Sequence, residues 1–132
     1  MLINRECDYG LRIIRNLSDD EVVSIREVAE REMISNAIAY KVAGKLEKGG
    51  LVTSMRGNKG GYMLTRPLDR ITILDVYNIM EPDACINECL KPGYECPIHT
   101  IQGRRCGVHQ ELKRIQDVLF RELSSKTINE LA

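Results

Sequence analysis

The sequence predicts a mainly α-helical chain with one small β-hairpin, arranged as a winged helix-turn-helix that is followed by a long C-terminal helix. Three stretches with helical apolar spacing come first, and two short strand patterns around a glycine-rich turn follow them. A final stretch repeats apolar residues every three or four positions. The 132 residues suit one domain with an appended element, and 43% of them are apolar, which is enough for a core.

Two short helices open the predicted domain. The first is expected over residues 6–18, where apolar side chains recur on one face. The second begins after Ser24, because residues 24–27 have the capping-box pattern, in which the serine accepts from first-turn amides and Glu27 reaches back. A polar turn at residues 19–21 separates the two helices.

A third helix is expected to begin at Ser35, because serine caps helix N-termini well. Ile38, Val42 and Leu46 lie four positions apart, with Ala39 and Ala43 beside them, and predict one buried stripe along this helix. The glycine pair at 49–50 ends it, since glycine tolerates the left-handed conformation of a C-terminal cap.

A hairpin follows the third helix. Its strands are expected at residues 51–55 and 62–65, and the turn at 56–61 contains three glycines. Thr72 then caps a fourth helix that runs to about Met80. The order of three helices and a hairpin is that of a winged helix-turn-helix.

The chain is expected to divide into a winged helix-turn-helix DNA-binding domain at residues 1–83, a cysteine-rich cofactor loop at 84–107, and a dimerisation helix with a terminal turn at 108–132. The loop has no usable periodicity and holds four of the five cysteines. The last helix has more apolar surface than a small chain can cover, so a homodimer is expected. Its apolar stripe consists of Val108, Leu112, Ile115, Leu119 and Leu123.

The distribution of charge, rather than its total, favours binding to double-stranded DNA. Nineteen basic and nineteen acidic residues cancel, but residues 36–70 contain seven basic and two acidic residues, a local net charge of +5. Such a patch can neutralise phosphates. A winged helix places its third helix in the major groove, and a basic hairpin can enter the minor groove. The expected DNA-binding residues are Ser35, Asn36, Ala37, Tyr40 and Lys41 around the third helix, with Arg56, Asn58 and Lys59 in the hairpin.

Four cysteines in the loop, Cys85, Cys89, Cys96 and Cys106, predict a metal cofactor. Their spacing is looser than the repeated pairs of zinc ribbons, whereas iron–sulfur sites accept thiolates from irregular loops. An iron–sulfur cluster, of two-iron or four-iron type, is therefore the expected cofactor. Zinc binding and thiol–disulfide switching without a metal are the alternatives.

Three further residues of metal-ligating type receive simpler interpretations. Cys7 is expected to be a small buried hydrophobic residue of the first helix. His99 and His109 are expected to be polar loop or helix-start residues rather than ligands.

The sequence also bears on other functional classes. No enzyme is expected, because no C-x-x-C pair or Ser/His/Asp grouping stands out. A zinc-stabilised module that binds protein instead of DNA is the remaining rival. The sequence lacks an apolar run of membrane length and a signal-peptide pattern, which predicts a cytoplasmic location.

The wing at residues 56–64, Arg-Gly-Asn-Lys-Gly-Gly-Tyr-Met-Leu, closely resembles the wing signature of the IscR/NsrR/CymR regulators (the Rrf-two family). Residues 8–12 and 127–131 resemble the two ends of that family, so the similarity covers essentially the whole chain. The resemblance implies a dimeric transcription regulator that crosses its long penultimate helices and binds palindromic operators.

The same resemblance bears on the cofactor. Cluster-binding members usually carry three loop cysteines before the long helix, and Cys106 occupies the position of the last one. Cys96 and either Cys85 or Cys89 would be the others. In some members an acidic residue of the first helix completes the site from the partner subunit, and Asp8 occupies that position. This chain has four loop cysteines, so the resemblance leaves open which of them bind.

Overall fold

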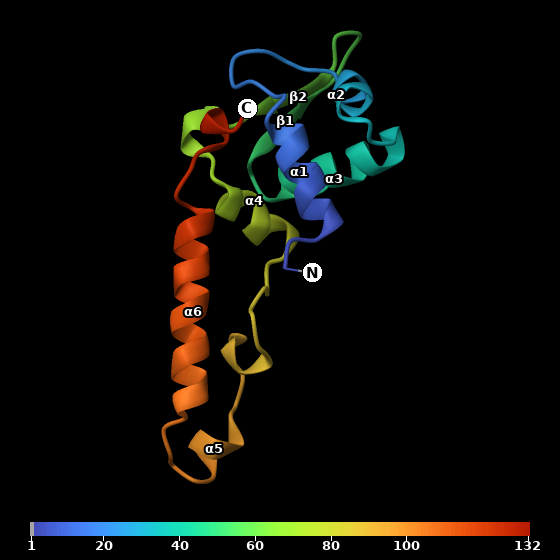
Figure 1. Cartoon of the computed structure of the whole chain (residues 1–132). Coiled ribbons are helices and arrows are strands. Elements are labelled where there is room, and N and C mark those ends of the chain that lie inside the picture. The colour runs from blue at the N-terminus through green and yellow to red at the C-terminus, as the bar shows by residue number, and fades with distance from the viewer. Residues whose placement is uncertain (1) are drawn as a thin grey trace.

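The structural elements follow one another in the predicted order. A computed structural model describes residues 2–132 (Figure 1). Its helices are α1 (Arg5–Ile14), α2 (Ile25–Glu32), α3 (Asn36–Lys48), α4 (Ile73–Met80), α5 (Pro97–Thr100) and α6 (Gly107–Leu123). The strands are β1 (Val52–Met55) and β2 (Gly61–Leu64), and single 3-10 turns are η1 (Leu68–Arg70), η2 (Glu88–Leu90) and η3 (Ile128–Glu130). The predicted fold class is confirmed.

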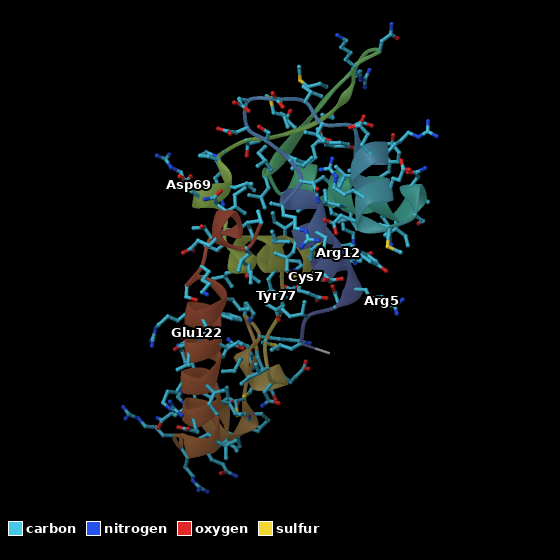
Figure 2. The ribbon with its side chains drawn as sticks, turned by 45° about the horizontal axis from the view of Figure 1, so that its top comes forward. Arg5, Cys7, Arg12, Asp69, Tyr77 and Glu122 are labelled. Atoms are coloured by element: carbon cyan, nitrogen blue, oxygen red, sulfur yellow. The ribbon has the colours of Figure 1, made fainter. Side chains whose placement is uncertain are left out.

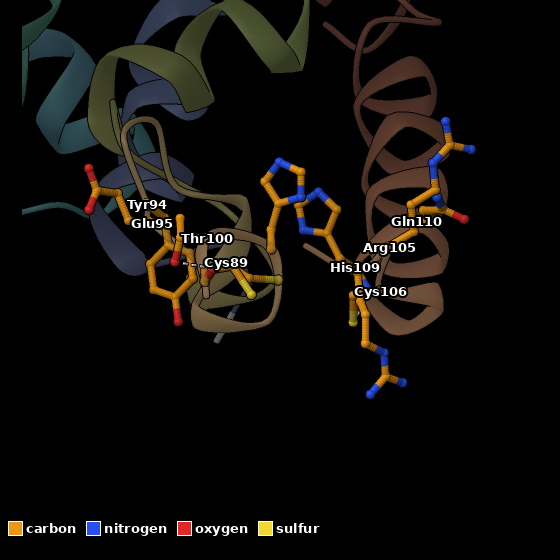
Figure 3. A pocket seen from close by; sticks show the side chains of 11 residues that line it. Cys89, Tyr94, Glu95, Thr100, Arg105, Cys106, His109 and Gln110 are labelled. Carbon is orange, nitrogen blue, oxygen red and sulfur yellow. Dashed lines mark hydrogen bonds between the residues drawn. The ribbon is translucent and has the colours of Figure 1, made fainter. Parts of the chain in front are cut away.

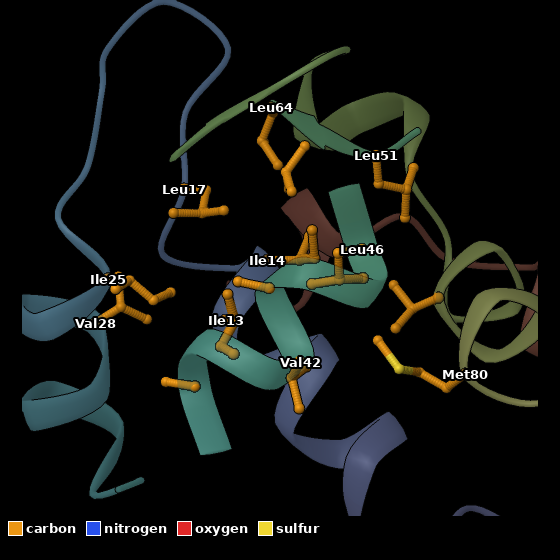
Figure 4. Packing of buried hydrophobic residues seen from close by; sticks show 14 of the residues in the cluster. Ile13, Ile14, Leu17, Ile25, Val28, Val42, Leu46, Leu51, Leu64 and Met80 are labelled. Carbon is orange, nitrogen blue, oxygen red and sulfur yellow. The ribbon is translucent and has the colours of Figure 1, made fainter. Parts of the chain in front are cut away.

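The core lies where α1, α3 and α4 meet (Figure 4). Ile13 and Ile14 of α1 pack with Val42 and Leu46 of α3 and with Val76 of α4, and all five side chains are fully buried. Complete burial of one such aliphatic side chain contributes about 1.5–3 kcal/mol. These contacts make residues 2–80 one unit, which we call the head.

Cys7 belongs to this core rather than to a site. Its side chain is fully buried on the side of α1 that faces α4, close to Tyr77 (Figure 2). Burial raises the pKa of the Cys7 thiol to about 11, so the thiol stays protonated at neutral pH. A protonated, inaccessible thiol is a poor metal ligand and a poor nucleophile.

Two of the predicted capping residues do begin helices in the structure. The Ser35 hydroxyl accepts from the backbone N–H of Ile38 at 3.3 Å, and Thr72 forms a capping box with Asp75. The capping box expected at Ser24 is wrong, because its hydroxyl makes no capping bond within the described part of the chain. The first helix ends at Ile14 instead of residue 18, although the turn beyond it still returns apolar side chains to the core.

The buried face of α3 agrees with the predicted one except at Ile38. Ile38 was expected to point inward, but its side chain is 38% exposed. The other four predicted residues, Ala39, Val42, Ala43 and Leu46, are buried as expected. Small alanines on this stripe allow α1 and α3 to pack closely, and Ile38 lies at the edge of the buried face.

The hairpin pairs β1 with β2 in antiparallel register, with Val52 opposite Leu64. Val23, in the segment before α2, forms a bridge with Tyr62 and so attaches the hairpin to the helices. Gly61 makes this attachment possible, because a Cβ atom there would lie 2.1 Å from the carbonyl oxygen of Val23. The hairpin is the wing of the fold.

After α4 the chain extends away from the head, and α6 leads back to it. Residues 84–106, here called the cysteine segment, run beside α6 and end at the side of the molecule opposite the wing (Figure 1). Helix α6 leads back, and Phe120 packs edge-on against Tyr77 with ring centroids 6.2 Å apart. The terminal turn η3 enters the core, where Ile128 is only 2% exposed and donates its N–H to the carbonyl of Ile71 at 2.7 Å. Among residues 2–132, no helix combines the length and apolar character that crossing a bilayer requires.

Candidate functional site

The residues predicted to contact DNA lie on two neighbouring exposed surfaces of the head. One is the N-terminal half of α3 and the other is the tip of the wing. All of these side chains are exposed, as contact with a duplex requires: Ser35, Asn36, Ala37, Tyr40, Lys41, Arg56, Asn58 and Lys59.

A groove connects the two surfaces. It has a volume of about 430 Å³ and lies between the start of α2, the exposed face of α3 and the wing. Tyr40, Arg56 and Asn58 line it, and so do Ser24 and Arg26, which the sequence analysis did not select. In the sequence, Ser24 and Arg26 stand at a helix start, which suggests a capping role only. Their place in the groove, where a serine hydroxyl lies beside a basic side chain, becomes visible only in the folded structure. A groove with such a lining suits a phosphodiester strand.

The basic face of α3 carries an internal counter-charge. Glu6 of α1 forms ion pairs with Lys41, at 2.9 Å, and with Lys45. These two hydrogen bonds hold the pKa of the Glu6 carboxyl below its ordinary value. One of the predicted DNA-binding lysines is therefore already engaged within the head.

A second candidate site lies in the cysteine segment. A cavity of about 390 Å³ opens between this segment and the start of α6 (Figure 3). Three thiols line it, those of Cys89, Cys96 and Cys106, and both histidines of the chain, His99 and His109, line it as well.

The fourth loop cysteine is placed differently. The described residues that line the cavity do not include Cys85, which lies at the root of the segment near α4. All five cysteines are free thiols. The two histidines, which were interpreted as polar residues, share the cavity with the thiols because α5 and the first turn of α6 face each other across it.

The donors of this cavity fit an iron–sulfur cluster by their chemistry. Cys106 caps α6, and its sulfur accepts from the backbone N–H of His109 at 3.5 Å, while the Asn87 amide donates to the sulfur of Cys89 at 3.1 Å. N–H donors to sulfur are a regular feature of iron–sulfur sites. Within residues 2–132, no group of three or more Cys, His, Asp or Glu side chains already converges on one point. The donors surround the cavity without forming a finished coordination sphere.

Asp8, the remaining predicted ligand, lies on α1 and does not line the cavity of its own chain, as far as residues 2–132 show. Its carboxylate pairs with Arg12 at 3.2 Å and is more than half exposed. It borders a shallow depression of about 180 Å³ formed by α1, α4 and the terminal turn. Asp8 is accessible from outside the subunit, so contact with a second subunit remains sterically open.

A buried carboxylate that the sequence analysis missed fixes α2 against α1. Glu32 is only 6% exposed, and its two oxygens accept from Arg15 at 2.7 Å each. Asn16 donates to it at 2.6 Å, and Arg12 at 3.2 Å. The hydrogen bond from Arg15 is the main reason that the pKa of Glu32 falls to about 2. The partners lie 16 to 20 positions away along the chain, so no local pattern indicates the pairing.

Comparison with known proteins agrees with this architecture. A model of the Rrf2 family, described as iron-dependent transcriptional regulators, matches residues 3–132. Protein aau3 of Rhizobium meliloti (strain 1021) is 28% identical over an alignment of 134 positions, which covers 99% of this chain and 84% of that protein.

Solved structures give the same result. CymR (YrzC), the global cysteine regulator of B. subtilis, is 26% identical with a TM-score of 0.73, covering 98% of this chain and 95% of that one. IscR of T. potens has a TM-score of 0.72 at 21% identity, covering 98% and 84% of the two chains, a likeness of fold.

Proposed function

Because this chain belongs to the Rrf2 family of iron-dependent transcriptional regulators, we propose that it acts as a homodimer and senses redox, nitric oxide or iron status through an iron–sulfur cluster in its cysteine segment. Members of the family are DNA-binding transcription regulators rather than enzymes. The observation that carries the cofactor proposal is that three thiols, those of Cys89, Cys96 and Cys106, line one cavity beside the start of α6.

In this proposal α3 lies in the major groove of a palindromic operator. Asn36 can bond an adenine edge with both groups of its amide, and Lys41 can reach a guanine edge or a phosphate. Arg56 and Lys59 at the wing tip enter or border the minor groove, where a narrow groove attracts arginine. The groove beside Arg26 receives the intervening backbone. Ser35, Ala37, Tyr40 and Asn58 complete the proposed interface.

The proposed cluster ligands are Cys89, Cys96 and Cys106, because soft thiolates hold iron against oxygen and nitrogen donors. His109 follows Cys106 by one helical turn and lines the same cavity, so it competes with Asp8 of the partner subunit for the fourth position. When bound, a cluster would supply chemistry that responds to oxygen, nitric oxide or loss of iron. The proposed ligands Cys96 and Cys106 lie on either side of α5 in the chain. A cluster bound to both would therefore fix the path of residues 97–105.

The dimer proposal rests on the surface of α6. None of the residues of this helix is buried in the single chain, and Val108 is 68% exposed, although the helix is amphipathic. Phe120 and Leu123 cover only its C-terminal end against the head. A second α6 would cover Ile115 and Val118, and in the dimer two α3 helices would meet half-sites about 34 Å apart.

The cofactor is tested by anaerobic purification with a visible spectrum and counts of iron and sulfide. We expect a brown protein, and we expect the Cys96→Ala/Cys106→Ala double variant to be colourless and to lose redox-dependent DNA affinity. The matched control is Cys85→Ala, which removes a thiol outside the cavity lining and should keep the colour. Oxygen-free wild-type protein without iron that cannot be reconstituted would refute the cluster, and stoichiometric zinc would favour the zinc alternative.

The DNA interface is tested by the salt dependence of binding to an operator selected from random duplexes. Each lysine or arginine that neutralises a phosphate contributes about 0.9 to the slope of log K against log salt. In the proposed homodimer the Arg56→Gln/Lys59→Gln variant removes four such side chains and should therefore lower the slope by about 3 to 4. The matched control is Lys113→Gln/Arg114→Gln, which removes one lysine and one arginine from an exposed part of α6 away from the wing. An unchanged slope in the wing variant would remove the wing from the interface.

A further inference from the structure

Glu6 holds two lysines of the helix that faces DNA in the proposed function. Lys41 Nζ lies 2.9 Å from one carboxylate oxygen of Glu6, and Lys45 donates to the other oxygen. Both lysines stay substantially exposed in this arrangement, with 64% and 41% of their side chains accessible. A phosphate can therefore approach either ammonium without any rearrangement of the fold.

The position of Glu6 is fixed by the turn that carries it. The Asn4 side chain accepts from the backbone N–H of Cys7 at 2.8 Å, which caps α1. The amide of Asn4 also donates to Glu81, directly after α4. The two hydrogen bonds of Asn4 and the burial of Cys7 together fix the first turn of α1. The Glu6 carboxylate is therefore held close to Lys41 and Lys45 of α3.

We propose that Glu6 is a positioning residue that competes with DNA phosphates for Lys41 and Lys45 and thereby limits the affinity of the protein for DNA. The inference rests on the proposed function, because it requires α3 to face the duplex. The two ammonium groups carry two positive charges, and the single carboxylate of Glu6 balances one of them in the free protein. DNA binding must therefore either break these pairs or bring a phosphate close to the Glu6 carboxylate, and both reduce the gain from the lysines.

The test measures binding to a fluorescein-labelled duplex of random sequence, because competition for phosphate contacts does not depend on bases. Glu6→Gln keeps the size of the side chain and removes its charge. We expect Kd to fall by about three- to tenfold at low salt, as for the release of two partly exposed ion pairs. We also expect the salt slope to become steeper by about 1 to 2. Glu122→Gln makes the same change in net charge on an exposed part of α6 (Figure 2) and should leave both quantities close to wild type.

A second background separates competition from a general effect of charge. In a Lys41→Gln/Lys45→Gln protein, the Glu6→Gln substitution has no lysine to release, so the tightening should vanish. Thermal unfolding of each variant checks that the head is folded. Unchanged or weaker binding by a folded Glu6→Gln protein would overturn the inference and leave the proposed function intact. Failure of wild type itself to show salt-dependent binding would overturn both.

Discussion

Replacing Glu32 by glutamine should destabilise the head in a way that depends on pH. The carboxylate of Glu32 is buried and accepts two hydrogen bonds from Arg15, and its pKa falls from 4.5 to about 2. A shift of this size corresponds to about 3 kcal/mol. Arg15 is 45% exposed and partly screened by water, so we expect a loss of about 2 kcal/mol at pH 7, or about 7 °C in Tm.

The sign of the pH dependence follows from the direction of the shift. Because the folded state lowers the pKa, the unfolded chain binds more protons between pH 4.5 and about 2. The stabilisation is complete above pH 4.5 and disappears as the pH falls toward 2. The difference between wild type and Glu32→Gln should therefore shrink to about half its neutral value near pH 3.

Urea unfolding followed by circular dichroism at pH 7, 4 and 3 measures this difference. The control is Glu30→Gln, which removes an exposed carboxylate from the same helix and should change stability by less than about 0.5 kcal/mol. Equal stability of wild type and Glu32→Gln at pH 7 would refute the role of the buried pair. A difference that stays constant down to pH 3 would refute its electrostatic origin.

Three other substitutions test separate parts of the structure. Gly44→Ala should raise stability by about 1 kcal/mol in urea unfolding, because a Cβ there meets nothing within 4 Å and alanine favours a helix; a loss of stability would contradict the packing of α3. Gly61→Ala should lower Tm and weaken DNA binding, because its Cβ would collide with the Val23 carbonyl and displace the wing; wild-type values for both would contradict that contact. Ile115→Glu should yield monomers in sedimentation velocity while the head stays folded, since Ile115 lies on the exposed apolar face of α6; a persistent dimer would place the interface elsewhere.

The parts of the fold that sequence could predict are those set by neighbouring residues. Ser35 and Thr72 cap their helices as expected, because a hydroxyl and the amides three positions later are close by geometry alone. The wing follows from a glycine-rich turn between two short apolar strands. The exposure of Ile38 could not be predicted in this way, because a helical pattern that correctly marks Ala39 and Ala43 as buried does not show where the packed face of α3 ends.

In the candidate sites, too, the sequence shows the residue types but not the contacts between distant elements. The cysteines are visible in the sequence, but their grouping around one cavity with His99 and His109 depends on how α5 folds back toward α6. The pairing of Glu6 with Lys41 spans the distance between two helices, and so does that of Glu32 with Arg15. Ionic contacts between elements leave no periodic trace in a sequence, so such residues resemble ordinary surface charges until the helices are placed.

The burial of Ile128 has a consequence for the synthesis of this protein. The residue follows the cysteine segment and α6 in the chain, and it donates to Ile71, which precedes them. A ribosome releases the N-terminal helices first, but the core remains open at this point until residue 128 has been translated. The head is therefore completed only after the chain that follows the cysteine segment has been made, and a truncation that removes residues 128–130 would leave an unfilled hole beside Ile71.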